Sequence, residues 1–288
     1  MNSTIFNDRV TIIIVSFHSD LIIENLINKI EKNIRIIIVE NSLDLTLKKN
    51  LEEKFKNVQV IIPKENIGNG AGINLGLSLV KTKYAIYLDA DVIPKENMIE
   101  VLLKYTEKVK NFSILAPREI NYNYRNDQYI VNNKNTGLHK MRFITGCVLL
   151  LNMKSLAKTG YFDENIFLYY EEHDLYHRCI KHGLDIYMID EAEYFHQGTS
   201  STKSIYSHEI YLNRNWHYCW SKFYYFRKNY GYFYGIKKTI PNFFRALRKY
   251  IFYSLIGRKQ NSSLHKAELQ GLISSYLLKK STKRPKIN

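Results

Sequence analysis

Two carboxylates one residue apart, Asp89 and Asp91, directly follow the apolar run Tyr84–Leu88. Acidic side chains at the mouth of a buried strand can hold a divalent cation, and such a cation can hold a diphosphate. The pair alone is weak evidence, because Asp is also favoured near a helix start and a helix is expected from Pro94. The rest of the sequence has to decide between these two interpretations.

A second acidic group, Glu171-Glu172-His173-Asp174, follows the aromatic run Phe167–Tyr170. These residues could form the solvated first turn of a helix, which the helix dipole would stabilise. One of the carboxylates could instead act as a general base, because the aromatic run indicates partial burial and burial would raise its pKa. The pattern favours the two interpretations equally.

His196 ends an apolar segment and is followed by Gln-Gly-Thr-Ser. A single histidine is usually structural. Here, one of its ring nitrogens could join Asp91 and a diphosphate around a single cation. A mixed set of nitrogen and oxygen ligands suits Mn²⁺ as well as Mg²⁺.

Short apolar runs alternate with amphipathic segments of helix length, which predicts an α/β fold with a mostly parallel sheet flanked by helices. Open parallel sheets bind ligands at the carboxyl ends of their strands. Ser16, Glu40 and Asp89 are expected at that edge. The expected strands are 11–17, 34–40, 58–63, 84–88, 141–151, 184–190 and 193–196, and the expected helices are 20–32, 45–56, 66–81, 94–110, 171–182, 210–230 and 240–255.

Residues 66–76 form a segment rich in glycine and asparagine that begins with Asn66. The segment does not match a dinucleotide-binding motif, because Leu75 stands where the third glycine would be required. It does not match a P-loop either, since no Gly-Lys-Ser/Thr follows. By itself the segment predicts a glycine-rich turn at the start of a helix.

The net charge of +15 is unevenly distributed along the chain. Residues 203–288 contain 18 Lys/Arg and 2 Asp/Glu, whereas residues 1–202 contain 24 and 25. The chain is therefore expected to consist of a balanced globular domain, 1–202, and a basic, aromatic-rich helical extension, 203–288. The last residues of the extension, 279–288, are expected to be disordered.

The three cysteines contain no Cys-x-x-Cys pair, so neither a zinc site nor a disulfide framework is indicated, and a reducing compartment is expected. The N-terminus lacks the features of a signal peptide. No apolar run approaches the roughly eighteen residues needed to span a bilayer. A cytoplasmic location is therefore expected.

The order and spacing of these segments resemble family 2 glycosyltransferases of the GT-A fold, especially bacterial rhamnosyltransferase-like members that act on surface polysaccharide. The similarity covers roughly residues 10–230, and no single segment is specific on its own. The matching segments are 14–19, 38–42, 66–76, 88–92, 145–150, 160–164, 167–175 and 196–198.

The resemblance implies a donor site and a metal site. Ser16 and Glu40 fall where the family holds the nucleobase and its ribose. Asp89 and Asp91 match the family's D-x-D motif, in which the second carboxylate binds Mn²⁺ or Mg²⁺. His196 matches the histidine that completes the metal site.

The resemblance also implies a catalytic base at Glu172, with Glu171 and Asp174 as alternatives beside the substrates. Asn66 begins the family's N-x-G-x-x-x-G-x-N-x-G segment and is assigned to substrate binding. Two positions depart from the family, because Glu replaces the usual Asp at 40 and 172. Each replacement extends the reach of the carboxylate by one methylene group.

The expected function is metal-dependent, inverting transfer of a sugar from a nucleoside diphosphate sugar to a hydroxyl of a cell-surface polysaccharide or lipid-linked glycan. One alternative is a sugar-phosphate nucleotidyltransferase, whose usual N-terminal glycine-rich basic loop is missing from residues 12–20. The other is a non-catalytic basic scaffold at a membrane or nucleic acid. The ordered acidic residues and His196 favour the enzyme.

The basic extension could attach the protein to the inner face of the cell membrane, since aromatic and basic residues on amphipathic helices favour the interface. It could also pack on the catalytic domain or join copies of the chain into a homo-oligomer. Nucleic-acid binding is not expected, because the extension carries no recognised nucleic-acid motif. Packing combined with membrane contact is the favoured interpretation.

Overall fold

The computed structural model describes residues 8–198 and 207–285. The chain divides into two compact units. The first contains the residues up to Ile67, Ala71–Phe162 and Leu175–Thr202. The second contains Gly68–Gly70, Asp163–Asp174 and the chain from Lys203 onward.

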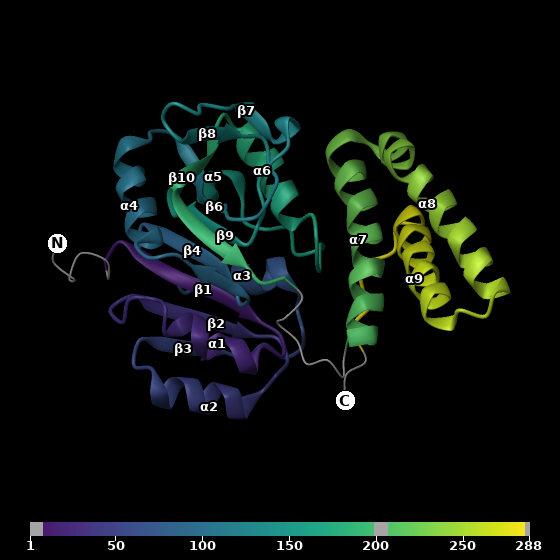
Figure 1. Ribbon diagram of the computed structural model, residues 1–288, viewed down its shortest axis with the longest axis horizontal. Helices are drawn as coiled ribbons and strands as arrows, with labels where there is room; N and C mark the ends of the chain where they lie inside the picture. Colours follow the sequence, from purple (N-terminus) through teal and green to yellow (C-terminus); the bar gives the residue numbers. More distant parts are fainter. Residues whose placement is uncertain (1–7, 199–206, 286–288) are drawn as a thin grey trace. The chain divides into compact units, whose positions relative to one another are not determined.

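The described residues form one ten-stranded sheet in the order β3-β2-β1-β4-β9-β6-β10-β8-β7, with β5 paired to β10 (Figure 1). The strands are β1 (Val10–Ser16), β2 (Arg35–Glu40), β3 (Val58–Ile61), β4 (Tyr84–Asp89), β5 (Val92–Pro94), β6 (Phe112–Glu119), β7 (Tyr129–Val131), β8 (Leu138–Met141), β9 (Val148–Asn152) and β10 (Asp185–His196). The predicted α/β fold is confirmed, with a sheet that is parallel in its N-terminal part and mixed beyond it.

The N-terminal strands are parallel because each is short, β-branched and buried on both faces, which is typical of strands joined by helical crossovers. Their register sets the site. Ser16 lies opposite Glu40, and Val15 lies opposite Asp89. The carboxyl ends of β1, β2 and β4 therefore meet at one edge, as predicted.

The later strands differ from the prediction in several places, and β5, β6 and β7 were not among the expected strands. The expected strand 141–151 is two strands, β8 and β9, separated by a turn. The expected strands 184–190 and 193–196 are one strand, β10, interrupted by a shift in register between Ile189 and Glu193. Since β9 runs antiparallel between β4 and β6, it brings Cys147, the residue before it, to the end of β4.

Helices pack around this sheet (Figure 1). They are α1 (Asp20–Ile27), α2 (Leu45–Lys54), α3 (Asn69–Leu77), α4 (Met98–Lys108), α5 (Met153–Thr159) and α6 (Glu171–Lys181), with a short 3₁₀ helix at Asn126–Gln128. Successive residues of a strand face opposite sides, so Ile12 and Ile14 belong to one apolar cluster and Ile13 to another. Both faces of the sheet are therefore covered.

The second unit contains helices α7 (Ser207–Tyr230), α8 (Tyr232–Leu255) and α9 (Lys259–Tyr276), which lie side by side (Figure 1). Trp216, Trp220 and Ala267 form their apolar centre. A Cβ atom on Gly271 of α9 would lie 2.3 Å from the Trp216 carbonyl oxygen, so glycine is needed for this close approach. Helix α9 was not predicted, because its polar residues obscure the apolar period.

The expected disorder of residues 279–288 is wrong for most of its length. The Trp220 indole donates to the Lys279 carbonyl, and the buried His217 imidazole lies 2.9 Å from the Lys283 carbonyl and 3.0 Å from the Ser281 hydroxyl. These contacts fix the segment against α7. Residues 286–288 lie outside the described part of the chain.

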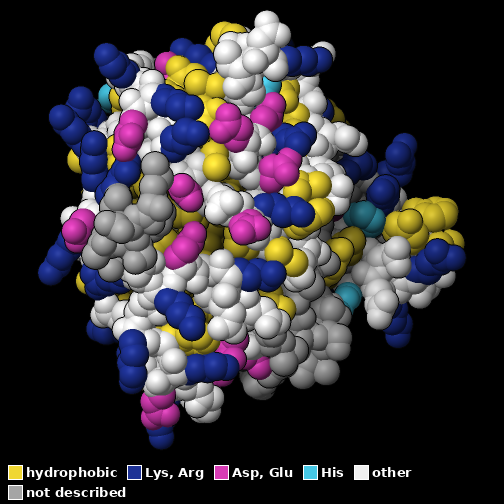
Figure 2. Space-filling view, turned by 60° about the vertical axis from the view of Figure 1, so that its left-hand side comes forward, with side chains coloured by type: hydrophobic (Ala, Val, Ile, Leu, Met, Phe, Trp, Pro, Cys, Tyr) yellow, Lys and Arg dark blue, Asp and Glu magenta, His cyan; other side chains and the backbone are white. Residues whose placement is uncertain are grey.

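Charged side chains are mixed on the face shown in Figure 2, where Lys and Arg are interspersed with Asp and Glu. Within residues 8–198 and 207–285, none of the helices combines the length and the apolar character that crossing a bilayer requires.

Candidate active site

Backbone pairing brings His196 beside Asp91 although the two are far apart in the chain. Strand β10 pairs with β5 so that His196 lies opposite Val92, and the Gln197 amide donates to the Asp91 carbonyl at 3.0 Å. As a result, Nε2 of His196 lies 3.2 Å from Oδ1 of Asp91. The predicted metal site required the Asp91 carboxylate and the His196 imidazole to lie side by side, and they do so in the structure.

The other ring nitrogen of His196, Nδ1, faces two residues that the sequence did not single out. Cys147 Sγ and Glu119 Oε1 each lie 3.7 Å from it. The hydrogen bond to Asp91, helped by those to Cys147 and Glu119, raises the pKa of His196 well above its ordinary value. Glu119 ends β6, a strand that the sequence did not predict.

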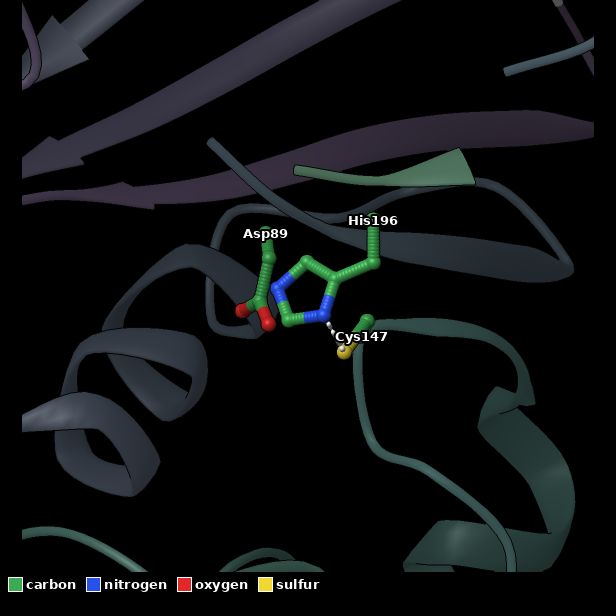
Figure 3. A group of neighbouring side chains, drawn as sticks. All are labelled: Asp89, Cys147 and His196. Atoms are coloured by element: carbon green, nitrogen blue, oxygen red, sulfur yellow. Dashed lines mark hydrogen bonds between the residues drawn. The ribbon is translucent and has the colours of Figure 1, made fainter. Parts of the chain in front are cut away.

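Asp89 lies on the same side of the sheet (Figure 3). Burial raises its pKa to about 6, although the hydrogen bond that Tyr87 donates to Oδ1 acts in the opposite direction. The Asp89 amide donates to the Cys147 carbonyl at 2.9 Å, which holds the two residues together. Asp89, Cys147 and His196 each offer a donor atom, and these three atoms lie within 4.8 Å of one another.

Glu40 is a fully buried carboxylate at the end of β2. Burial raises its pKa, while the Ser16 and Ser42 hydroxyls favour its charged form. The Ser42 amide donates to its Oε1 at 2.6 Å. Its second oxygen, Oε2, is buried, and no hydrogen bond to it is found among the described residues. An oxygen in this position is suited to accept a hydrogen bond from a ligand hydroxyl.

Asn66 lies half-buried in the loop between β3 and α3. Beyond it, glycines bring α3 close to β1. A Cβ atom on Gly76 would lie 2.6 Å from Ile13 Cγ2, and one on Gly72 would lie 3.0 Å from Val15 Cγ1. Gly72 and Gly76 lie inside α3 and not in a turn before it, and they allow close packing of this helix on β1.

The acidic group at the start of α6 belongs to the second unit. The rest of the helix, from Leu175 onward, belongs to the first unit. It follows two tyrosines in left-handed backbone conformation, Tyr169 (φ 64°) and Tyr170 (φ 70°). Non-glycine residues held in this region cost about 1–3 kcal/mol each and are often found at functional sites. Arg214 Nε donates to the Tyr169 hydroxyl at 2.6 Å and helps to hold this turn.

The three carboxylates of this turn have different surroundings. Asp174 is fully buried, with Lys228 Nζ 2.8 Å from Oδ2 and Asn229 Nδ2 3.1 Å from Oδ1. Glu171 is buried and accepts a hydrogen bond from Asn69 Nδ2 at 2.9 Å. The Glu172 side chain is 21% exposed, so it is the most accessible of the three.

The expectation that burial raises the pKa of the base is wrong for Glu172. Burial does act in that direction, but the hydrogen bond and the charge of His173 outweigh it and hold the pKa of Glu172 below its ordinary value. His173 Nδ1 lies 3.3 Å from Glu172 Oε1. Aromatic rings alone do not determine the pKa of Glu172, because the imidazole of His173 lies within contact.

The donor atoms at the sheet edge fit the expected cation. Carboxylate oxygens and one imidazole nitrogen are ligands that Mn²⁺ accepts, and Mg²⁺ accepts the oxygens. The structure thus brings Asp89, Asp91 and His196 together in the first unit, at the edge where Ser16 and Glu40 also lie. Glu171, Glu172 and Asp174 form a separate group in the second unit.

Many solved structures resemble this one, among them the following three. The mannosyltransferase PcManGT from Pyrobaculum calidifontis, in complex with GDP-Man and Mn²⁺, gives a TM-score of 0.59 at 10% identity, covering 93% of this chain and 86% of that one. S. aureus TarS 1–349 gives a TM-score of 0.55 at 13% identity, covering 94% of this chain and 92% of that one. GalNAc-T7 with UDP, GalNAc and Mn²⁺ gives 0.56 at 15% identity and covers 66% of this chain.

The present chain spans only 44% of that GalNAc-T7 chain. None of the curated proteins matches the chain. The sequence model of the family described as Glycosyl transferase family 2 matches residues 11–179, which is more than half of the chain. The chain therefore belongs to glycosyl transferase family 2 and is a glycosyltransferase with the GT-A fold.

Proposed function

We propose that this glycosyltransferase moves a sugar, with inversion, from a nucleoside diphosphate sugar to a hydroxyl of a growing cell-surface glycan, and that it depends on Mn²⁺ or Mg²⁺. The observation that carries the proposal is the contact of His196 Nε2 with Asp91 Oδ1 at 3.2 Å. A carboxylate and an imidazole at the carboxyl edge of an open sheet lie where such folds bind their ligands. Bound there, a divalent cation would neutralise the diphosphate and so favour its departure.

The donor is held by the strand ends beside that pair. The buried Glu40 carboxylate and the Ser16 hydroxyl would accept and donate hydrogen bonds to the nucleoside, and Asn66 lies in the neighbouring loop. Asp89 would bind a ribose hydroxyl or a water of the cation. Neighbours solved with GDP-Man or with UDP support a nucleotide donor of this kind.

Glu172 is the proposed general base. It takes the proton of the acceptor hydroxyl as that oxygen forms a bond to the anomeric carbon and the bond from this carbon to the diphosphate oxygen breaks. A single displacement inverts the anomeric centre and releases the nucleoside diphosphate. Glu172 is preferred to Asp174 and Glu171 because it is the most exposed of the three, while Asp174 is engaged by Lys228 and Asn229.

The second unit is proposed to contact the membrane through α8. This helix contains five basic residues and no acidic residue. Phe244 is 62% exposed and Leu255 is 81% exposed, and together with Arg248 and Ile251 they line one groove on the outside of the helix. Their spacing of three or four residues puts them on one face, so the helix presents a row of apolar side chains that includes the positive charge of Arg248.

Such a stripe suits the surface of an anionic bilayer, where apolar side chains enter the interface and each basic residue adds about 1 kcal/mol. The acceptor would then be a glycan carried on lipid at the inner face of the cell membrane. In this arrangement residues 1–202 perform catalysis and residues 203–288 position the enzyme. The alternative is that the same extension joins copies of the chain into a homo-oligomer.

The donor proposal can be tested by thermal shift with UDP-, dTDP- and GDP-sugars, each with and without Mn²⁺. dTDP-rhamnose has priority because the motifs resemble rhamnosyltransferases. Stabilisation by one donor that requires the metal is expected. The anomeric configuration of the product, read by NMR, then tests inversion. An unchanged melting temperature with every donor, both with and without Mn²⁺, would contradict the proposal.

A further inference from the structure

The imidazole of His196 has different partners on its two sides. Nε2 faces the Asp91 carboxylate at 3.2 Å. Nδ1 faces the Cys147 sulfur at 3.7 Å (Figure 3). The proposed cation site needs only the first side. Hard cations such as Mg²⁺ prefer oxygen ligands, so a sulfur atom at this position contributes little to binding them.

The second side has the dimensions of a zinc site. Zn²⁺ binds thiolate at about 2.3 Å and imidazole at about 2.0–2.1 Å in tetrahedral geometry, which separates sulfur from nitrogen by roughly 3.5 Å. The observed separation of Cys147 Sγ and His196 Nδ1 is 3.7 Å. The third donor, a carboxylate oxygen of Asp89, lies within 4.8 Å of the donor atoms of the other two residues.

Rigid strand ends hold these donors in place. Strands β4 and β9 are paired up to Leu88 and Val148, and the Asp89 amide donates to the Cys147 carbonyl just beyond. Glu119 Oε1 also lies 3.7 Å from His196 Nδ1, so a further carboxylate is within reach of a cation on this side. Sulfur, nitrogen and oxygen donors therefore lie near one another at the ends of these strands.

We propose that Asp89, Cys147 and His196 form a second cation site that takes a thiophilic divalent ion such as Zn²⁺, and that it cannot be filled together with the site at Asp91. A neutral imidazole offers one lone pair, so His196 can ligate through Nδ1 or through Nε2 but not through both. With zinc on Nδ1, the Nε2–H donates to Asp91, which becomes the carboxylate that orients the ligand. Cys147 releases its thiol proton to solvent as it binds.

The consequence is that Zn²⁺ should inhibit the transferase by removing His196 from the Asp91 site. This competition rests on the proposed function, but the existence of the second site does not. The cysteine pattern gave no sign of the site, because its ligands come from the ends of three separate strands.

The test is titration of the reduced full-length protein with Co²⁺, a spectroscopic substitute for Zn²⁺. Wild-type protein is expected to show a sulfur-to-cobalt charge-transfer band in the near ultraviolet, which Zn²⁺ abolishes and Mg²⁺ does not. Cys147→Ser and Cys147→Ala should lose the band and weaken Zn²⁺ binding by at least about 100-fold, the upper end of the effect of losing an outer-shell partner. Cys179→Ser and Cys219→Ser alter buried free thiols elsewhere and should keep the band.

Wild-type protein without the band, or a Cys147→Ser protein that retains it, would overturn the second site. Competition is read separately, from the Mn²⁺ electron paramagnetic resonance signal. Zn²⁺ should release bound Mn²⁺ from wild-type protein at far lower concentration than from Cys147→Ser. If the cobalt band is present but Mn²⁺ never binds, the zinc site stands and the proposed manganese dependence fails.

Discussion

Glu172 and Asp174 offer a paired test of the proposed base, because the structure gives them opposite roles. Asp174 is fully buried and holds Lys228 and Asn229, whereas the Glu172 side chain is 21% exposed and contacts His173. Glu172→Gln should leave the fold intact and abolish turnover. Asp174→Asn should weaken the fold and leave the turnover of the folded protein nearly unchanged.

The magnitudes follow from these contacts. Removing one partner of a buried ion pair costs about 3–5 kcal/mol, but Lys228 is 31% exposed and also bonds Asp163, so we expect about 2 kcal/mol for Asp174→Asn. That corresponds to a drop in Tm of roughly 4–8 °C. Loss of a general base lowers kcat by roughly 10²–10⁴-fold, which is the effect expected for Glu172→Gln.

Both effects can be measured on one set of proteins, by differential scanning fluorimetry and by release of nucleoside diphosphate at saturating donor and acceptor. Glu171→Gln serves as the matched neighbour, since its partner Asn69 can also bond an amide oxygen. A fully stable Asp174→Asn protein with no turnover would refute the assignment. Normal turnover by Glu172→Gln would do the same.

Three further predictions follow from other parts of the molecule. Asp91→Asn should keep the wild-type Tm but lose the Mn²⁺-dependent shift with the donor, and a retained shift would remove Asp91 from the metal site. Burial lowers the pKa of His217 from 6.5 to about 3, so below pH 6.5 the unfolded chain binds a proton that the folded chain does not. The free energy of unfolding should therefore fall as the pH drops from 6.5 towards 3, and urea unfolding of His217→Gln should show a weaker dependence of this free energy on pH. Phe244→Glu with Leu255→Glu should abolish pelleting with anionic liposomes, whereas Leu45→Glu, an exposed change on α2, should not; equal pelleting would discard the membrane role.

Much of the site could be predicted because parallel strands present their carboxyl ends at one edge. Ser16, Glu40 and Asp89 follow apolar runs that are unmistakable as strands, so their common edge follows from the fold class. His196 ends a similar run. The prediction therefore needed only the order of elements along the chain, together with the family's motifs.

Cys147 and Glu119 could not be predicted, because their place depends on which strands are neighbours. The hydrophobic pattern predicted a strand over the residues of β9, but it did not predict β6, nor that β9 is inserted between β4 and β6. The partners of Asp174 were missed for a similar reason. Lys228 and Asn229 lie in a long helix whose many aromatic and basic residues gave no hint of which lysine is inward-facing.

At Gly68 the glycine-rich segment 66–76 approaches the aromatic run Phe167–Tyr170 closely. Its backbone has φ +87°, and an added Cβ atom would lie 2.3 Å from the Phe167 carbonyl oxygen, which also accepts the Asn69 amide at 2.9 Å. Steric contact and torsion angle both exclude other residues here. A Gly68→Ala change should therefore displace the turn at Phe167, and a loss of activity in that variant would reflect a shift of the turn that precedes Glu172.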